Sequence, residues 1–480
     1  MRVLFVTSEA TPFARTGGLA EFCGSLPIYL SNQGINTDII LPFYRCIKEG
    51  GYSLKLVIEK LRLGLGWRWL NFSVFQTYLK ENIRVFLIEK DEFFDRSFLY
   101  GTEKEEYFDN AERFIFFTKA VLNFIEHYNE SWDIIHCHDW QTALIPVYLK
   151  QNFYPQLNSI KTVLTIHNLG YQGIFPSETF SFTNLPANLF SINGLEFFGQ
   201  INFLKGGIIF ADFLTTVSPT YAKEIQTPHY GFGLDGVLKI YAHKLKGILN
   251  GVDYTIWNPE IDPYIAINYS NSNLEGKKIC KEDLLATCGL PIDLKERPLL
   301  AMVSRLVEQK GIDILLPILE KLMQKGVCLI ILGQGNKYYE DTLKSIAAAY
   351  PNQMKVEIKF DNILSHKIIA GADMLLMPSR YEPCGLAQMY AMKYGTIPIV
   401  HHTGGLADTV IDVNSEKKIG TGFKFYDYTA KAFLEAIERA LFYFEQKKEM
   451  WYSLMQEAMR CDFSWEKSAH EYLLLYQSLL

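Results

Sequence analysis

The feature that most constrains the fold is an alternation of short apolar segments with helical segments along the 480-residue chain. In the second half, RPLLAMVSRL contains an apolar run, GIDILLPILEKLMQKG has a helical pattern, and VCLIILGQG is a second apolar run that ends in glycines. Short, continuously apolar strands are typical of parallel sheets covered on both faces. The second half therefore predicts an α/β domain with a doubly wound parallel sheet.

The first half repeats this plan. RVLFVTSE is followed by a helical stretch over residues 19–33 and by NTDIILP, while WDIIHCHDW and KTVLTIHN predict later strands that end in polar residues. Alternating residues on both sides of Glu81-Asn82 predict a hairpin inserted into this domain. A chain of this length exceeds the size of one core, so at least two domains are expected.

The boundary between the two patterns is rich in turn-forming residues. Asn, Gly, Asp and Pro accumulate in GILNGVDYTIWNPEIDPY, where the helical periodicity lapses. We therefore expect one Rossmann-like domain at residues 1–258 and a second at residues 259–462. Ligands of such sheets bind beyond the carboxyl ends of the strands, so two crevices that face each other across a cleft would make one site.

Composition excludes several classes of partner. The formal net charge of −6 supplies no broad basic surface for nucleic acid. No apolar stretch approaches the roughly 20 residues that span a bilayer, and no signal-like leader precedes the first strand. The eight cysteines are scattered without a Cys-x-x-Cys pair, as in reduced cytosolic proteins. We expect a soluble, cytoplasmic protein that binds neither nucleic acid nor membrane.

Two glycine turns are candidate anion sites. TGGLAE at residues 16–21 and TGGLAD at residues 403–408 each follow a predicted strand and open a helix. Paired glycines can expose backbone amides, and a helix N-terminus adds partial positive charge, so such a turn can bind a phosphate. The alternative is that each Gly-Gly pair only makes a tight turn.

Polar residues follow several of the predicted strands. In the first half they are Glu9, Arg15, Asp139, His167 and Asn168, and in the second half Arg305, Lys310, Gly333-Gln334-Gly335, Glu382 and Thr403. The carboxyl ends of parallel strands meet at one edge of a sheet, so these residues predict a site with both cations and acids.

Seven segments carry a wider resemblance, which covers nearly the whole chain: SEATPFARTGGLAE, HCHDWQTAL, TIHNLGYQGIF, GILNGVDYTIWNP, VSRLVEQKG, PSRYEPCGLAQMYAMKYGTIPIV and TGGLADTV. In order and spacing they resemble the bacterial glycogen synthases and plant starch synthases, which are retaining glycosyltransferases of the two-Rossmann GT-B type. The resemblance implies transfer of glucose from ADP-glucose to the non-reducing end of an α-1,4-glucan such as glycogen, without a metal or other cofactor. It also implies that residues 463–480 form a helix that packs back on the first domain.

The resemblance implies roles for individual residues as well. Arg305 and Lys310 would bind the leaving diphosphate, which needs positive charge in the transition state. Glu382 would hold hydroxyls of the donor glucose, with Asp139 and His167 beside the same sugar. The remaining substrate-binding candidates are Glu9, Arg15, Gly17, Gly18, Tyr100 on the acceptor side, Asn168, Asn250, Cys384, Gly385, Leu386, Thr403, Gly404 and Gly405.

Other interpretations of these residues stay open. Arg305 and Lys310 could be solvated surface cations, and Glu382 could cap a helix. The run His136-Cys137-His138-Asp139 suggests a metal site, but successive side chains of a strand point to opposite faces, so packing or hydrogen bonding is the better explanation for the two histidines.

Three positions differ from the usual wording of the family. Arg15 replaces a lysine, Glu21 replaces an aspartate, and Ala387 replaces a polar residue. Arg15 keeps the charge but exchanges a compact ammonium for a planar fork. Two alternatives therefore remain: a GT-B transferase with another donor such as UDP-glucose, and a weakly catalytic homologue that binds or primes glucan.

Overall fold

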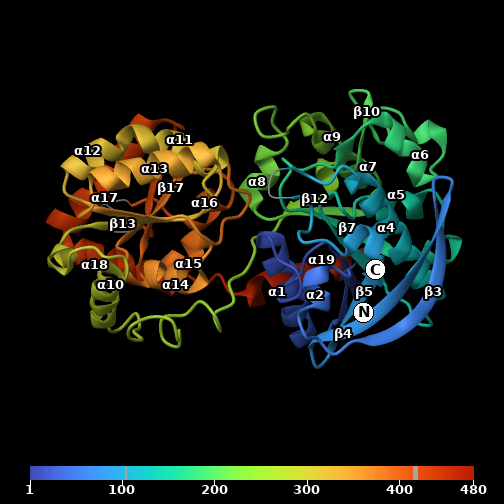
Figure 1. Ribbon diagram of the computed structural model, residues 1–480, viewed down its shortest axis with the longest axis horizontal. Helices are drawn as coiled ribbons and strands as arrows, with labels where there is room; N and C mark the ends of the chain where they lie inside the picture. The colour runs from blue at the N-terminus through green and yellow to red at the C-terminus, as the bar shows by residue number, and fades with distance from the viewer. Residues whose placement is uncertain (103–104, 414–419) are drawn as a thin grey trace. The chain divides into compact units, whose positions relative to one another are not determined.

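The computed structural model describes residues 1–102, 105–413 and 420–480. The chain forms two compact units, Met1–Gly251 with Trp465–Leu480, and Val252–Ser464 (Figure 1). The first boundary between the units follows Gly251, whereas residue 258 was predicted to end the first domain. The second boundary precedes Trp465, whereas the final helix was predicted to begin at residue 463. The reason is that Val252 pairs with Ser464 in a parallel bridge and donates its N–H to the Phe463 carbonyl at 2.7 Å, so both crossing segments leave the second unit together.

The first unit is built on a large sheet. Its nine strands within the described residues are, in order across the sheet, β12 (Leu245–Gly247), β11 (Phe213–Thr216), β7 (Lys161–Ile166), β6 (Ile134–His138), β1 (Arg2–Val6), β2 (Asn36–Pro42), β5 (Ile83–Glu89), β4 (Arg68–Lys80) and β3 (Lys55–Leu65). The strands from β12 to β5 are parallel, as the continuous apolar runs predict, and all of them except the short edge strand β12 are largely buried.

The antiparallel edge of this sheet includes the predicted hairpin. β4 pairs antiparallel with β5 around Glu81-Asn82, which confirms that prediction. β3 extends the edge and was not predicted, because only two of its eleven residues are buried and two register shifts interrupt its pairing with β4. A separate small sheet contains β8 (Ile174–Phe175), β10 (Gln200–Asn202) and β9 (Glu196–Phe197).

The first unit contains the following helices among its described residues. They are α1 (Gly18–Asn32), α2 (Arg45–Lys48), α3 (Asp91–Phe94), α4 (Asn110–His127), α5 (Leu144–Lys150), α6 (Phe180–Thr183), α7 (Phe203–Phe210), α8 (Pro219–Glu224), α9 (Asp235–Ile240) and α19 (Trp465–Leu479). The C-terminal α19 lies beside α1 (Figure 1), and its Ser468 hydroxyl donates to the Leu249 carbonyl at 2.6 Å. The last helix thus completes the core of the first unit.

The second unit has a parallel sheet of six strands within the described residues. Their order is β15 (Met354–Glu357), β14 (Cys328–Leu332), β13 (Leu299–Val303), β16 (Met374–Met377), β17 (Ile397–His401) and β18 (Phe423–Phe425). The helices are α10 (Glu275–Thr287), α11 (Ile312–Leu315), α12 (Leu319–Gln324), α13 (Lys337–Ala349), α14 (Asn362–Gly371), α15 (Ala387–Lys393), α16 (Gly404–Thr409), α17 (Ala430–Gln446) and α18 (Lys448–Arg460). Figure 1 shows helices on both sides of this sheet, with α11, α12 and α13 on one and α10, α14 and α15 on the other. Among the helices described, none combines the length and apolar character needed to cross a membrane.

Candidate active site

The carboxylate of Glu9 organises the loop that follows β1. It is buried, and it accepts hydrogen bonds from the backbone N–H of Thr16 at 2.5 Å and from the Thr16 hydroxyl at 2.6 Å. The Tyr100 hydroxyl donates to the same carboxylate at 2.6 Å, from 91 positions away in the sequence. Two predicted site residues, Glu9 and Tyr100, are therefore in contact, and together they fix the residue that precedes Gly17.

The first glycine turn is open. Gly17 and Gly18 are exposed, and a Cβ atom added at either position would meet no heavy atom of the described residues within 4 Å. Gly17 is the N-cap of α1, and no side chain in the described ranges caps this helix. Because the first N–H groups of a helix attract anions, the geometry suits a phosphate. Packing does not account for these two glycines.

Arg15 and Glu21, two of the residues that depart from the family wording, form an ion pair with each other. The Arg15 guanidinium lies 3.0 Å from the Glu21 carboxylate, and both side chains are partly exposed. The two departures are thus coupled across the open glycine turn. The effects of these two substitutions on the turn should therefore be considered together.

Asp139 lies at the carboxyl end of β6 in the left-handed backbone region, with φ of 54°. Its side chain accepts the backbone N–H of His167 at 2.7 Å. Burial raises the pKa of Asp139 to about 7, although the amides of His167 and Asn168 oppose this shift. Burial lowers the pKa of His167 to about 3, so its imidazole is neutral at pH 7.

The two histidines of β6 have different partners. The ring nitrogens of His136 lie 2.7 Å from the Tyr476 hydroxyl of α19 and 2.6 Å from the Thr165 hydroxyl, which ties the last helix to the sheet. His138 Nδ1 lies 3.1 Å from His167 Nε2. His136 therefore supports packing, whereas His138 orients a predicted site residue.

Two asparagines of the first unit were also predicted. The Asn168 side chain accepts the backbone N–H of Gly170 at 2.9 Å and shapes the loop after β7. Asn250 is buried, and its Oδ1 has no hydrogen-bond partner among the residues that the structure describes. Because a buried unpaired acceptor is costly, the Asn250 oxygen is suited to receive a ligand hydroxyl.

In the second unit, Lys310 and Glu382 form a largely buried ion pair. Lys310 Nζ lies 2.6 Å from Glu382 Oε2, and the Ser379 hydroxyl donates to the same oxygen at 2.8 Å. Glu382 is only 6% exposed, so the Lys310 charge compensates a carboxylate that water hardly reaches. Ser379 was missed in the sequence, although it stands three positions before Glu382 in PSRYEPCGL.

Arg305 differs from Lys310 in its surroundings. Its side chain is exposed, and one guanidinium nitrogen donates to Gln309 Oε1 at 3.4 Å, a weak bond. The guanidinium therefore keeps most of its donor capacity for an external anion.

The second glycine turn is closely packed. A Cβ atom at Gly404 would lie 1.9 Å from the Glu382 carbonyl oxygen, and one at Gly405 would lie 2.0 Å from the Cys384 carbonyl oxygen. The Gly405 N–H donates to the Glu382 carbonyl at 3.1 Å. The turn from Thr403 thus supports the backbone around Glu382. Its glycines are explained by packing, unlike those of the first turn.

The loop from Cys384 to Leu386 precedes α15. Gly385 has a φ of +70°, which favours glycine, and Leu386 is the N-cap of α15. The Gln388 side chain donates to the carbonyls of Cys384 and Gly385 at 3.1 and 3.0 Å, so the loop is held from inside the helix.

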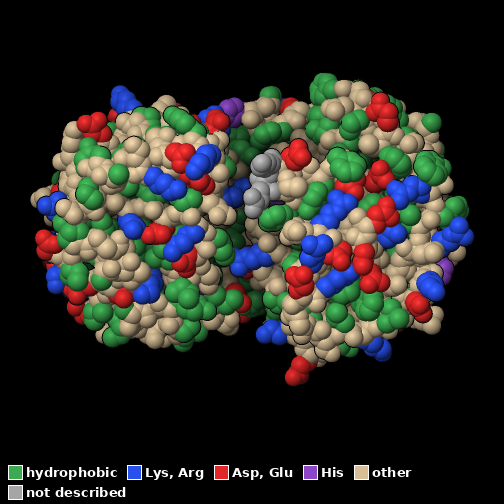
Figure 2. Space-filling view, in the orientation of Figure 1, with side chains coloured by type: hydrophobic (Ala, Val, Ile, Leu, Met, Phe, Trp, Pro, Cys, Tyr) green, Lys and Arg blue, Asp and Glu red, His purple; other side chains and the backbone are tan. Residues whose placement is uncertain are grey.

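One hollow in the described surface of the first unit lies apart from the predicted site residues. It has a volume of about 460 Å³ and is lined by the end of α4, residues 128–133, 156–157 and 159–160, and Leu480. On the face shown in Figure 2, acidic and basic side chains are interspersed over both units.

Comparison with known proteins decides the family. The chain is 46% identical over 485 residues to the glycogen synthase of Fervidobacterium nodosum, covering 99% of this chain and 98% of that relative. The chain belongs to the glycogen and starch synthase family. It is likewise 44% identical to the glycogen synthase of Thermotoga maritima over 487 residues, covering 100% of this chain and 99% of that relative. The family model for the starch synthase catalytic domain matches residues 2–240, and that for glycosyl transferases group 1 matches residues 292–450.

Solved structures agree with this family. The catalytic domain of starch synthase IV from Arabidopsis thaliana, bound to ADP and acarbose, has a TM-score of 0.91 and 32% identity, covering 99% of this chain and 98% of that chain. Sucrose-phosphate synthase from Thermosynechococcus elongatus has a TM-score of 0.63 and 17% identity, covering 100% of this chain and 98% of that chain, and shares the fold. The predicted family and the predicted α/β fold of two parallel-sheet domains are confirmed.

Proposed function

We propose that this chain is a glycogen synthase that transfers glucose from ADP-glucose, with retention of configuration, to the non-reducing end of an α-1,4-glucan. The observation that carries the proposal is the 46% identity to a glycogen synthase over 99% of the chain. A related structure with 32% identity was bound to ADP and acarbose, which supports an adenosine diphosphate donor and a glucan acceptor.

Glucosyl transfer needs stabilisation of the leaving diphosphate and of the positive charge that develops on the sugar. In our proposal the exposed guanidinium of Arg305 and the ammonium of Lys310 bind the diphosphate oxygens. Among the described residues, the two hydrogen bonds to the Glu382 carboxylate both end on Oε2, so Oε1 accepts a hydroxyl of the donor glucose. The buried Lys310–Glu382 pair holds this carboxylate in a fixed orientation.

The first unit carries proposed substrate-binding residues of its own. The open amides of Gly17 and Gly18 bind the distal phosphate, and Arg15 lies beside them in its pair with Glu21. Asp139 and the neutral His167 contact the transferred glucose, and the unpaired Oδ1 of Asn250 accepts one of its hydroxyls. Asn168, Thr403 and the loop from Cys384 to Leu386 shape the site. These assignments, like the cytoplasmic location, remain predictions.

The decisive experiment is a transfer assay with radiolabelled ADP-glucose and, separately, UDP-glucose, each with glycogen as acceptor. Incorporation from ADP-glucose into chains that an α-1,4-specific glucanase digests supports both the donor and the retained configuration. A preference for UDP-glucose would show that UDP-glucose, and not ADP-glucose, is the donor. Incorporation from neither nucleotide sugar would leave a glucan-binding or priming role. Glu382→Gln is the control, because it keeps the shape of the side chain while removing its charge.

A further inference from the structure

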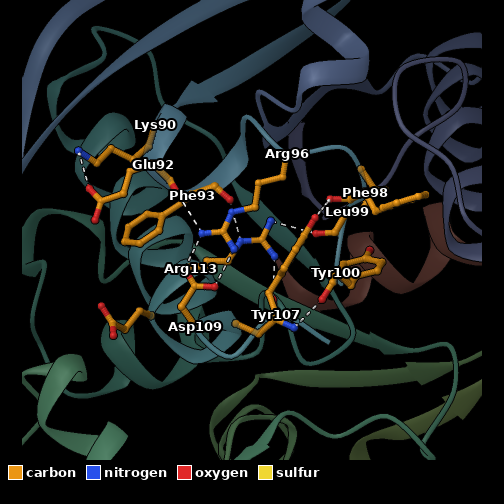
Figure 3. A network of polar contacts seen from close by, with 12 residues as sticks. Lys90, Glu92, Phe93, Arg96, Phe98, Leu99, Tyr100, Tyr107, Asp109 and Arg113 are labelled. Carbon is orange, nitrogen blue, oxygen red and sulfur yellow. Dashed lines mark hydrogen bonds and ion pairs between the residues drawn. The ribbon is translucent and has the colours of Figure 1, made fainter. Parts of the chain in front are cut away.

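A fully buried arginine lies near the proposed donor turn without being part of it. Arg113, in the first turns of α4, has 0% of its surface exposed. Its guanidinium donates to the Phe93 carbonyl at 2.7 Å and to the Leu99 carbonyl at 2.9 Å (Figure 3). It also donates to Asn110 Oδ1 at 2.7 Å. These acceptors are neutral. A buried charge is costly, so its retention on neutral partners calls for an explanation.

The bonds of Arg113 converge on the segment that carries Tyr100. Arg113 holds the Leu99 carbonyl directly, while Asn110, whose Oδ1 binds Arg113, donates through Nδ2 to the Tyr100 carbonyl at 2.9 Å. The Tyr107 N–H donates to the same Tyr100 carbonyl at 2.9 Å. The two peptide groups that set the direction of the Tyr100 side chain are thereby fixed.

A second arginine reinforces this segment. Arg96 forms two bonds to the Asp109 carboxylate, at 2.7 and 2.5 Å (Figure 3). The guanidinium groups of Arg96 and Arg113 lie 4.6 and 5.0 Å from the centre of the Tyr107 ring. Cation–π contacts to both arginines hold this ring, and its backbone supports Tyr100.

From Tyr100 the connection continues to the glycine turn. The Tyr100 hydroxyl donates to Glu9 and lies 2.7 Å from the Ser8 hydroxyl. Glu9 in turn accepts both the N–H and the hydroxyl of Thr16, the residue directly before Gly17. A continuous series of hydrogen bonds therefore runs from Arg113 through Tyr100 and Glu9 to the open turn.

We infer that Arg113 is a positioning residue for the donor: through Tyr100 and Glu9 it holds the Gly17-Gly18 turn in the geometry that receives the distal phosphate. The inference rests on the proposed function. Arg113 itself contacts no substrate, because Tyr100, Glu9 and Thr16 intervene. Within this series, the Tyr100 hydroxyl orients the Glu9 carboxylate.

The test compares steady-state kinetics of Arg113→Lys, Tyr100→Phe and the double variant. Loss of one buried, charge-assisted link raises KM for ADP-glucose roughly five- to tenfold, whereas KM for glycogen changes less than about twofold. Since both changes break one series, the double variant resembles the stronger single variant. A purely structural role of Arg113 would instead lower the active fraction, leave KM for ADP-glucose unchanged, and add to the effect of Tyr100→Phe.

Asn110→Asp tests the same connection if the Arg113→Lys variant fails to fold. The aspartate keeps an acceptor for Arg113 but removes the N–H that binds the Tyr100 carbonyl, so it is expected to fold and to weaken donor binding in the same way. The matched control is Lys119→Met, which removes another buried cation of α4 whose ammonium donates to Asn184 Oδ1 at 2.6 Å, on a different segment. This control is expected to leave KM for ADP-glucose unchanged.

Calorimetric titration with ADP separates binding from turnover. If the unchanged protein has no transfer activity, the proposed function fails, whatever the variants do. If it is active, and the Arg113→Lys and Asn110→Asp variants bind ADP as tightly as it does, the positioning role is refuted.

Discussion

The buried pair of Lys310 and Glu382 offers the sharpest test of the proposed site. In Lys310→Met the Glu382 carboxylate, 6% exposed, loses its cation and keeps the Ser379 hydroxyl. Removing one partner of a buried ion pair costs about 3–5 kcal/mol. Lys310 is partly reached by water, with 17% of its side chain exposed, so we expect a loss of about 2–3 kcal/mol in the free energy of unfolding.

The double variant Lys310→Met/Glu382→Gln separates stability from activity. With both charges removed, no uncompensated carboxylate is left. The double variant is therefore expected to lose about 1–2 kcal/mol less of the free energy of unfolding than the sum of the two single losses. Transfer activity is expected to fall at least a hundredfold in all three variants, because the double variant restores neither the diphosphate contact nor the sugar contact.

The measurements are urea denaturation and initial rates of transfer from ADP-glucose. Glu308→Gln is a suitable control, because Glu308 lies in the same loop and pairs with Arg380 at the exposed surface. Additive stability losses would show that the 2.6 Å contact is not an energetic pair. A double variant that recovered activity along with stability would refute the catalytic assignment of both residues.

Three further predictions concern the first unit and the second glycine turn. In a double-mutant cycle of Arg15→Lys and Glu21→Asp, the coupling free energy measured by urea denaturation is expected to stay below about 1 kcal/mol, because the pair is partly exposed. If the pair supports the turn, the KM for ADP-glucose changes less in the double variant than in Arg15→Lys. Equal KM values in all variants would exclude that role. Gly405→Ala is expected to lose about 2–4 kcal/mol of stability because its Cβ would lie 2.0 Å from a backbone oxygen, whereas Gly17→Ala, at an open position, is expected to lose less than about 1 kcal/mol; equal losses would contradict this difference. The raised pKa of Asp139, about 7, makes the folded protein bind a proton between pH 4 and 7 that the unfolded chain releases, so acidification through this window favours folding. Asp139→Asn should therefore steepen the loss of stability on lowering the pH from 7 to 4, as measured by urea denaturation, and an unchanged slope would refute the pKa shift.

Local patterns in the sequence were sufficient for much of the fold. Continuous apolar runs predict buried parallel strands, since such strands have both faces covered, and the alternation around Glu81-Asn82 predicts the hairpin of β4 and β5. β3 could not be predicted, because an exposed edge strand with register shifts lacks a regular apolar period.

Only part of the candidate site could be predicted from the sequence. Residues at strand ends are found by position, which is how Glu9, Asp139, Lys310 and Glu382 were predicted. Arg113 was not, because nothing near it in the sequence distinguishes a buried arginine from a solvated one. Its role depends on carbonyl groups 14 and 20 positions away that the chain brings to it.

The two glycine turns show what each level determines. The sequence alone determined that TGGLAE and TGGLAD are turns between a strand and a helix, because glycine pairs and the change of hydrophobic period are local properties. Only the tertiary structure decided that Gly17 is open while Gly405 lies against the backbone after Glu382. The physical reason is that steric contact and burial depend on which distant segments pack together, whereas backbone preference depends on the residue itself.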